Sequence, residues 1–161
     1  QVQPLTAATR PASSDPVSGM PALRVALARR PILSALGPDA DFVRHKTTRR
    51  EAYAAFPAPP GCFDVLLWNL RGELTEFTLG NVALMREGRW LTPALAAGLL
   101  PGTYRARLLQ GGAPDDPSRM QEARLHLHDL LLAEAAAFYN SVRGWLPVDL
   151  PALQAQVRAL S

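Results

Sequence analysis

The sequence has 161 residues, of which 48% are hydrophobic, so it can form one folded domain with a core and is not expected to be disordered throughout. Its formal net charge is +3, but the basic residues are scattered and not interleaved with aromatic side chains, which argues against a nucleic-acid surface. No apolar run approaches the roughly 20 residues that cross a bilayer, and the first residues do not resemble a signal peptide. We therefore expect a soluble, cytoplasmic protein with no nucleic-acid or membrane partner.

Two short regions precede the predicted domain. Residues 1–6 alternate like the end of a strand and are predicted to be the last piece of a preceding domain that is otherwise missing. Residues 7–21 consist largely of small residues and proline, which predicts a linker. The main domain is expected over residues 22–161, and the chain looks like part of something longer.

The predicted domain consists of short strands and a few helices. Period-two alternation predicts strands at residues 23–28, 63–69, 74–77, 81–86, 89–92, 122–128, 136–140 and 145–148. Helical spacing predicts helices at residues 47–56, 103–110, 129–135 and 151–160. Arg71-Gly72 and Glu87-Gly88 are expected to make tight turns, so most neighbouring strands should be antiparallel. Cys62, the only cysteine, is predicted to be a small, partly buried side chain and not a catalytic thiol.

Lys46 is the only lysine among the 17 lysine and arginine residues, and it lies in the motif Arg44-His45-Lys46-Thr47-Thr48-Arg49-Arg50. Arginine keeps its proton, whereas a lysine amine can lose one and form a Schiff base with a carbonyl compound. The sequence therefore suggests that position 46 requires an amine. The alternative is a chance lysine at the solvated start of a helix.

Two further motifs contain groups that could bind a ligand. Glu76 lies in a predicted strand beside apolar residues, so its carboxylate is either solvated or buried to meet a specific positive partner. The segment Gly98–Arg105 places Gly102 directly before a predicted helix, where backbone amides and the helix dipole can bind a phosphate. A helix start of this kind can also bind nothing.

Polar residues also follow the strand predicted at residues 136–140. Asn140-Ser141-Val142-Arg143-Gly144 presents an amide, a hydroxyl and a guanidinium at a strand end, which suits a ligand site but also suits a tight turn. His126 and His128 share one face of a predicted strand, but no third ligand is suitably spaced, so no metal site is predicted.

The order of these motifs resembles that of the fold-type IV pyridoxal-phosphate enzymes, the family of class IV aminotransferases and aminodeoxychorismate lyases. The similarity extends over roughly residues 23–150, and it includes Tyr53 after the Lys46 motif and Asn81 after Glu76. His-Lys-Thr-Thr-Arg-Arg and Asn-Ser-Val-Arg-Gly-Trp look most like aminodeoxychorismate lyases, especially the form fused behind an aminodeoxychorismate synthase component.

The resemblance implies that this chain binds pyridoxal 5′-phosphate. Lys46 would hold the cofactor covalently and later act as general acid and base, and Glu76 would pair with the pyridine nitrogen. The residues implied for cofactor phosphate binding are Gly102, Thr103, Tyr104 and Ser141. Tyr104 stands where aminotransferases often have threonine, so only its backbone amide is expected to contribute. Asn140 and Arg143 are implied to bind the substrate.

The resemblance also implies an α/β (α+β) fold, the large C-terminal domain of these enzymes, which is a mostly antiparallel pseudo-barrel of strands flanked by helices. The implied activity is a carbon–oxygen (oxo-acid) lyase that converts 4-amino-4-deoxychorismate into pyruvate and 4-aminobenzoate in folate biosynthesis, as a homodimer. Alternatives are an aminotransferase of the branched-chain or D-amino acid type and a non-catalytic assembly domain. Because the smaller N-terminal domain, or an upstream synthase component, is expected to complete the site, we expect weak activity from this chain alone.

Overall fold

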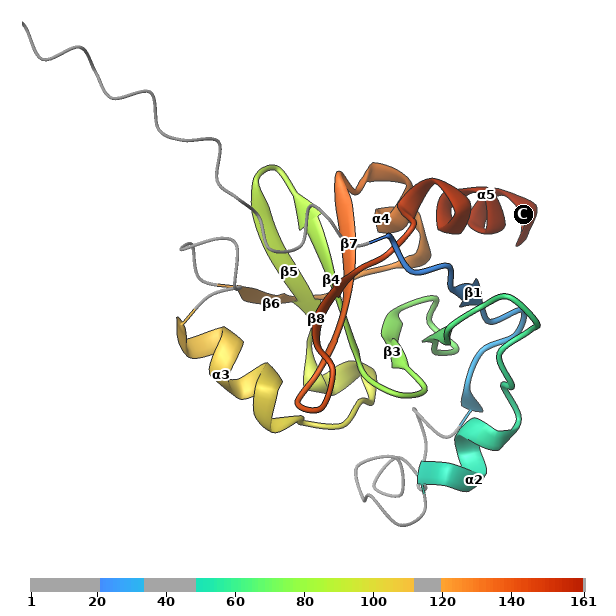
Figure 1. Ribbon diagram of the computed structural model, residues 1–161, viewed down its shortest axis with the longest axis horizontal. Coiled ribbons are helices and arrows are strands. Elements are labelled where there is room, and N and C mark those ends of the chain that lie inside the picture. Colours follow the sequence, from blue (N-terminus) through green and yellow to red (C-terminus); the bar gives the residue numbers. More distant parts are fainter. Residues whose placement is uncertain (1–20, 34–48, 112–119, 161) are drawn as a thin grey trace, which may run out of the picture.

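The computed structural model describes residues 21–33, 49–111 and 120–160 (Figure 1). The predicted end of a preceding domain, the linker up to residue 20 and residues 44–48 of the Lys46 motif lie outside the described residues. Within the described ranges, none of the helices combines the length and the apolar character that a membrane span requires.

The described strands form two sheets. The smaller sheet has the order β1-β2-β3, with β1 (Ala26–Leu27) parallel to β2 (Val65–Trp68) and β2 antiparallel to β3 (Leu74–Phe77). The larger sheet has the order β6-β5-β4-β7-β8 and contains β4 (Asn81–Arg86), β5 (Arg89–Pro93), β6 (Gln121–Ala123), β7 (Ala135–Asn140) and β8 (Gly144–Pro147). Its strand pairs are antiparallel except for β5 with β6.

Helices flank both sheets. They are α2 (Arg49–Ala54), the short 3-10 helix η2 (Leu95–Ala97), α3 (Thr103–Gly111), α4 (Leu127–Leu132) and α5 (Leu150–Leu160). The predicted α+β fold of short, mostly antiparallel strands with flanking helices is confirmed. The turn predicted at Glu87-Gly88 is confirmed as well, because both residues have positive φ angles, 52° and 75°, between the paired strands β4 and β5.

Three strand predictions were too long, and one of them, expected at residues 63–69, covers only Val65–Trp68. The strand expected from residue 23 is reduced to β1, because Leu23 forms only an isolated bridge with Val148. The strand expected over residues 122–128 ends at Ala123, and α4 begins at Leu127. The carboxylate of Asp129 accepts a hydrogen bond from the backbone N–H of His126 (2.7 Å), a contact that stabilises the start of the helix. His126 and His128 therefore do not share a strand face.

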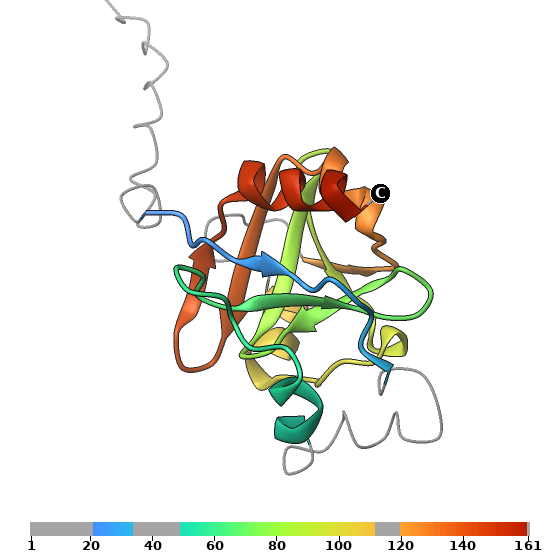
Figure 2. The same cartoon turned by 90° about the vertical axis from the view of Figure 1, so that its right-hand side faces the viewer.

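The five-stranded sheet is covered on both faces because its central strands alternate between two cores. Val82 and Leu84 of β4 pack with residues of the smaller sheet and of α5, whereas Ala83 packs toward α3. In β7, Phe138 packs in the same core as Val82 and Leu84, and Tyr139 packs in the same core as Ala83. Figure 1 shows α3 on one side of β4 and β7, and Figure 2 looks onto the layer formed by β1, β2 and α5 on the other side.

A third group of buried side chains joins α2 to the smaller sheet. Tyr53 and Phe56 pack with Val65 and Leu67 of the second strand, and the partly buried Cys62 lies against them. The predicted structural role of Cys62 is thereby confirmed. This packing places α2, which follows the Lys46 motif in the sequence, against the same sheet that carries Glu76.

The outer edge of β1 is paired with a side chain. The Gln156 Oε1 atom of α5 accepts a hydrogen bond from the Leu27 backbone N–H (2.8 Å), and its Nε2 atom donates to the Val25 carbonyl (3.0 Å). A primary amide has both a donor and an acceptor, so Gln156 reproduces the contacts of a neighbouring strand. The amide thereby covers a strand edge that water or another chain would otherwise contact.

We expect the substitution Gln156→Leu to lower the free energy of unfolding by about 1–3 kcal/mol, because leucine fills a similar volume but leaves two backbone groups without partners. Denaturant unfolding would measure the loss, and faster hydrogen exchange at the Leu27 amide would locate it. Arg158→Ala, at an exposed position of the same helix, is the matched control. Equal losses in both variants would show that the edge contact is not what stabilises β1.

Candidate active site

Glu76 is a fully buried carboxylate on β3, with 0% of its surface exposed. Its Oε1 atom accepts a hydrogen bond from the Tyr53 hydroxyl of α2, and its Oε2 atom accepts one from the Leu100 backbone N–H (3.4 Å). Of the two interpretations that the sequence left open, burial is confirmed, but these two donors are neutral and not the positive partner that was expected. A carboxylate is expensive to remove from water unless donors surround it, so these contacts hold α2, β3 and the loop before α3 together.

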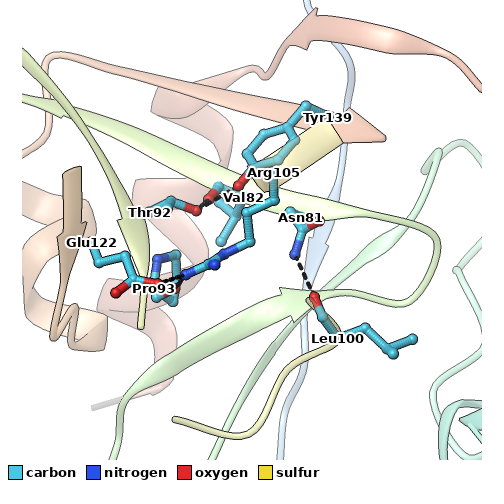
Figure 3. A network of polar contacts seen from close by, with 8 residues as sticks. All are labelled: Asn81, Val82, Thr92, Pro93, Leu100, Arg105, Glu122 and Tyr139. Atoms are coloured by element: carbon cyan, nitrogen blue, oxygen red, sulfur yellow. Dashed lines mark hydrogen bonds and ion pairs between the residues drawn. The ribbon is translucent and has the colours of Figure 1, made fainter. Parts of the chain in front are cut away.

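The loop before α3 is held by two asparagine side chains. The Asn69 Nδ2 atom donates to the Ala97 carbonyl (3.1 Å) at the end of η2. The Asn81 Nδ2 atom donates to the Leu100 carbonyl (3.5 Å), a contact drawn in Figure 3. The Gly102 backbone N–H also donates to the Leu100 carbonyl (2.9 Å). The start of the helix is therefore fixed relative to both sheets.

Gly102 is the N-cap of α3, because its carbonyl accepts the first helical hydrogen bond from the Ala106 N–H (3.1 Å). A glycine offers no side chain to cap the first-turn amides, which include those of Thr103 and Tyr104. A Cβ atom at position 102 would lie 3.1 Å from the Asn81 Oδ1 atom, closer than an ordinary contact. The predicted helix start is confirmed, and its amides and dipole suit an anion such as a phosphate.

The Tyr104 side chain belongs to an aromatic cluster between α3 and the larger sheet. Its ring lies 5.9 Å from that of Tyr139, which stacks on Trp145 at 5.6 Å, and Trp90 meets Trp145 edge-on at 4.8 Å. Because the ring is used for packing, the backbone N–H is what Tyr104 can offer to a ligand at the helix start. Thr103 is exposed there.

Asn140 fixes the turn between β7 and β8. Its Nδ2 atom donates to the Leu79 carbonyl (2.9 Å), and its Oδ1 atom accepts hydrogen bonds from two backbone N–H groups of the turn, at 3.1 and 2.6 Å. Ser141 and Arg143 are exposed in this turn, and the Arg143 guanidinium lies 5.1 Å from the centre of the Phe63 ring. The tight-turn interpretation of this motif is therefore correct, and substrate contacts by Asn140 and Arg143 stay predictions.

The structure brings most of the predicted positions to one end of the two sheets. Asn81 at the start of β4 pairs with Tyr139 near the end of β7, so the β7–β8 turn and the start of α3 lie at the same end. Glu76 reaches this end through Leu100. Lys46, the predicted catalytic residue, lies outside the described residues.

Two residues of the site were not predicted as site residues. Tyr53 was interpreted as a core residue because it is spaced helically with Phe56, and Asn81 was interpreted as the first residue of a strand. Both belong to the motifs that carry the family resemblance. A hydroxyl or amide within an otherwise apolar pattern is a signal that could have identified them, because such groups need hydrogen-bond partners when buried.

A buried hydroxyl pair lies beside the aromatic cluster. The Thr92 Oγ1 atom donates to the Val82 carbonyl (2.7 Å), and because this uses its only proton, Tyr139 must donate to Thr92 across the 2.8 Å between their oxygens (Figure 3). Burial raises the pKa of the Tyr139 hydroxyl well above its ordinary value of 10.0. The phenol is therefore neutral in the folded protein at physiological pH.

Tyr139 makes stability depend on pH in the alkaline range. Its pKa is higher in the folded than in the unfolded chain, so its contribution to the free energy of unfolding is complete below pH 10.0 and falls above it. We expect Tyr139→Phe to make stability decline less steeply above that pH. Unfolding curves at several alkaline pH values would measure the slope, and Tyr104→Phe is the control; identical slopes in all three proteins would contradict the assignment.

Comparison with known proteins agrees with this geometry. A model of the family Amino-transferase class IV matches residues 4–150. A Schizosaccharomyces pombe protein provisionally named aminodeoxychorismate lyase is 43% identical over 82 residues, which are 50% of this chain and 33% of that protein.

Two solved structures share the fold. One, from Mesorhizobium loti, is provisionally named an amino-acid aminotransferase; it is 36% identical, with a TM-score of 0.66, and the match covers 80% of this chain and 59% of that one. The other, from Legionella pneumophila, is provisionally named 4-amino-4-deoxychorismate lyase; it is 26% identical, with a TM-score of 0.58, over 80% of this chain and 47% of that one. This chain thus spans less than two thirds of each relative. It belongs to the class IV aminotransferase family.

Proposed function

We propose that this chain binds pyridoxal 5′-phosphate, the cofactor of its family. The described residues fit that molecule on two counts. Glu76 is a fully buried carboxylate that could pair with a protonated ring nitrogen, and the glycine-capped start of α3 could hold a phosphate. Their convergence at one end of the sheets, through the Leu100 amide, is the observation that carries the proposal.

Each group of residues would have a separate task in holding the cofactor. Lys46 would form the covalent bond to it, since an amine is the group that condenses with an aldehyde. Tyr53 would orient the Glu76 carboxylate. The backbone amides of Thr103 and Tyr104 would bind the phosphate, and the Ser141 hydroxyl is a further donor. When bound, pyridoxal phosphate supplies an electron sink for the substrate carbon that bears the amino group.

We further propose that the substrate is 4-amino-4-deoxychorismate and that the products are pyruvate and 4-aminobenzoate. Lys46 would remove the proton from the ring carbon that bears the amino group. The bond between the ring and the enolpyruvyl oxygen then breaks, the ring becomes aromatic, and the leaving enolpyruvate gains a proton and becomes pyruvate. Substrate and products balance without water, oxidant or reductant. Asn140 and Arg143 would bind the anionic substrate.

The likeness to the Schizosaccharomyces pombe protein supports a lyase, whereas the likeness to the Mesorhizobium loti structure supports an aminotransferase. The two activities differ in their products. A lyase releases pyruvate and 4-aminobenzoate from aminodeoxychorismate, whereas an aminotransferase moves an amino group from an amino acid to a keto acid. Chromatography of the products from each substrate pair would therefore separate the two functions. A homodimer, a role in folate synthesis and a preceding domain that completes the site are further parts of this proposal.

The amine of Lys46 can be tested directly. We expect incubation with pyridoxal phosphate, followed by borohydride reduction, to add the mass of one reduced cofactor to the peptide that contains Lys46. Lys46→Arg, which keeps the charge but cannot form the bond, is the control and should acquire none. An unmodified peptide in the unsubstituted chain would contradict both enzyme functions and leave the non-catalytic assembly domain.

We expect the turnover of Glu76→Gln to be about 100-fold lower than that of the unsubstituted chain. This is the typical effect of removing one positioned electrostatic contact. Glutamine has nearly the same volume but no negative charge to stabilise a protonated ring nitrogen. Glu73→Gln is the matched control. Glu73 is also buried and directly precedes β3, but its carboxylate pairs with Arg71 and Arg124, both at 3.7 Å. Equal losses in the two variants would remove Glu76 from the proposed chemistry.

A further inference from the structure

The first turn of α3 carries a buried arginine that the proposed chemistry does not use. Arg105 is 3% exposed, and its Nη2 atom donates to the Pro93 carbonyl (3.0 Å) and forms an ion pair with the Glu122 carboxylate (Figure 3). Among the described residues, no acceptor reaches its Nε atom. Arg105 is therefore an interior cation, although the Glu122 side chain is 44% exposed.

The two partners of Arg105 come from neighbouring strands of the larger sheet. Pro93 is the last residue of β5, and Glu122 lies in β6, which pairs with β5 in parallel through Thr92–Glu122 and Pro93–Ala123. The guanidinium thus joins two strand ends to the helix. Because a guanidinium is planar with several fixed donors, it holds this geometry more rigidly than a lysine would.

The position of Arg105 is unfavourable for the stability of the helix itself. A cation in the first turn lies at the positive end of the helix dipole, and a buried guanidinium with an unpaired Nε atom loses hydration. The guanidinium contributes to the positive potential of the first turn, where the Thr103 and Tyr104 amides lie, and the partly exposed Glu122 carboxylate offsets part of that charge. An anion bound at those amides would be attracted by the positive charge of Arg105, which is unfavourable for the helix when no anion is bound.

We propose that Arg105 is a positioning residue for the cofactor phosphate. It anchors the first turn of α3, and with it the amides proposed to bind the phosphate, to β5 and β6, and it is not proposed to touch the cofactor. This inference rests on the proposed function, because it names a residue that contributes to phosphate binding at that same site. Glu122 has a secondary task, which is to hold the guanidinium in place.

The test compares a ligand with and without its phosphate. Affinities for pyridoxal phosphate and for pyridoxal are measured by spectroscopic titration, and inorganic phosphate is titrated by its effect on thermal unfolding. We expect Arg105→Met to weaken binding of pyridoxal phosphate and of inorganic phosphate about tenfold, and that of pyridoxal by less than about twofold, because the lost interaction concerns the anion. Arg105→Lys should recover part of the affinity, and Glu122→Gln should lose about threefold.

A matched control separates positioning from general stability. Arg86, in β4 of the same sheet, forms an ion pair with Asp129 of α4 (2.5 Å), and both side chains are partly buried. Arg86→Gln therefore removes an ion pair away from α3. It should lower the thermal midpoint but leave the ratio of pyridoxal phosphate to pyridoxal affinity unchanged.

The outcomes distinguish this inference from the proposed function. If the unsubstituted chain binds pyridoxal phosphate no better than pyridoxal, the phosphate site itself is wrong and the inference falls with it. If the unsubstituted chain prefers the phosphate and Arg105→Met keeps the full preference, only the inference is wrong. Should Arg105→Met fail to fold, Glu122→Gln decides, and an unchanged preference in that variant overturns the inference.

Discussion

The burial of the Glu76 carboxylate is the constraint on which this end of the molecule depends. A charged group removed from water has to be surrounded by donors, and the chain supplies them from separate segments, the Tyr53 hydroxyl and the Leu100 amide. Meeting that requirement draws α2 and the loop before α3 toward the smaller sheet. The geometry that satisfies the carboxylate is therefore also the geometry that places the helix start next to it.

The helix start is the second charged feature of this end, with the opposite sign. Gly102 leaves the first amides of α3 without a side-chain cap, and the buried Arg105, paired with Glu122, lies in the same turn. An acid on one side and a positive helix end on the other suit a ligand that carries a cationic ring and an anionic phosphate. The aromatic cluster around Tyr139 supports this arrangement, since it packs α3 against the larger sheet.

The choice between lyase and aminotransferase depends on groups that face the substrate and not on the shared frame. Under the proposed function, both activities would use Lys46, Glu76 and the start of α3, so the described positions of Glu76 and α3 suit either one. The β7–β8 turn is where they would differ, and there Asn140 uses its amide to shape the backbone. Ser141 and Arg143 are therefore held in a fixed turn, although each is exposed.

The sequence by itself determined the local elements and the order of the chemical motifs. Strands such as Leu74–Phe77 and Asn81–Arg86 were predicted with their observed bounds, because alternation and glycine turns are local signals. Resemblance, and not periodicity, assigned Lys46 and Glu76 to a cofactor. The strand expected to reach His128 was wrong, since alternation contains no information on where the pairing partner ends.

Only the tertiary structure decided which polar groups are buried and what they contact. Glu76 is held by residues 23 and 24 positions away, and Arg105 by residues 12 and 17 positions away, separations at which sequence spacing carries no geometric information. Hydrogen bonding depends on distance and direction in space, and these exist only after the sheets have packed. The sequence determined which groups are present, and the packing determined which of them meet.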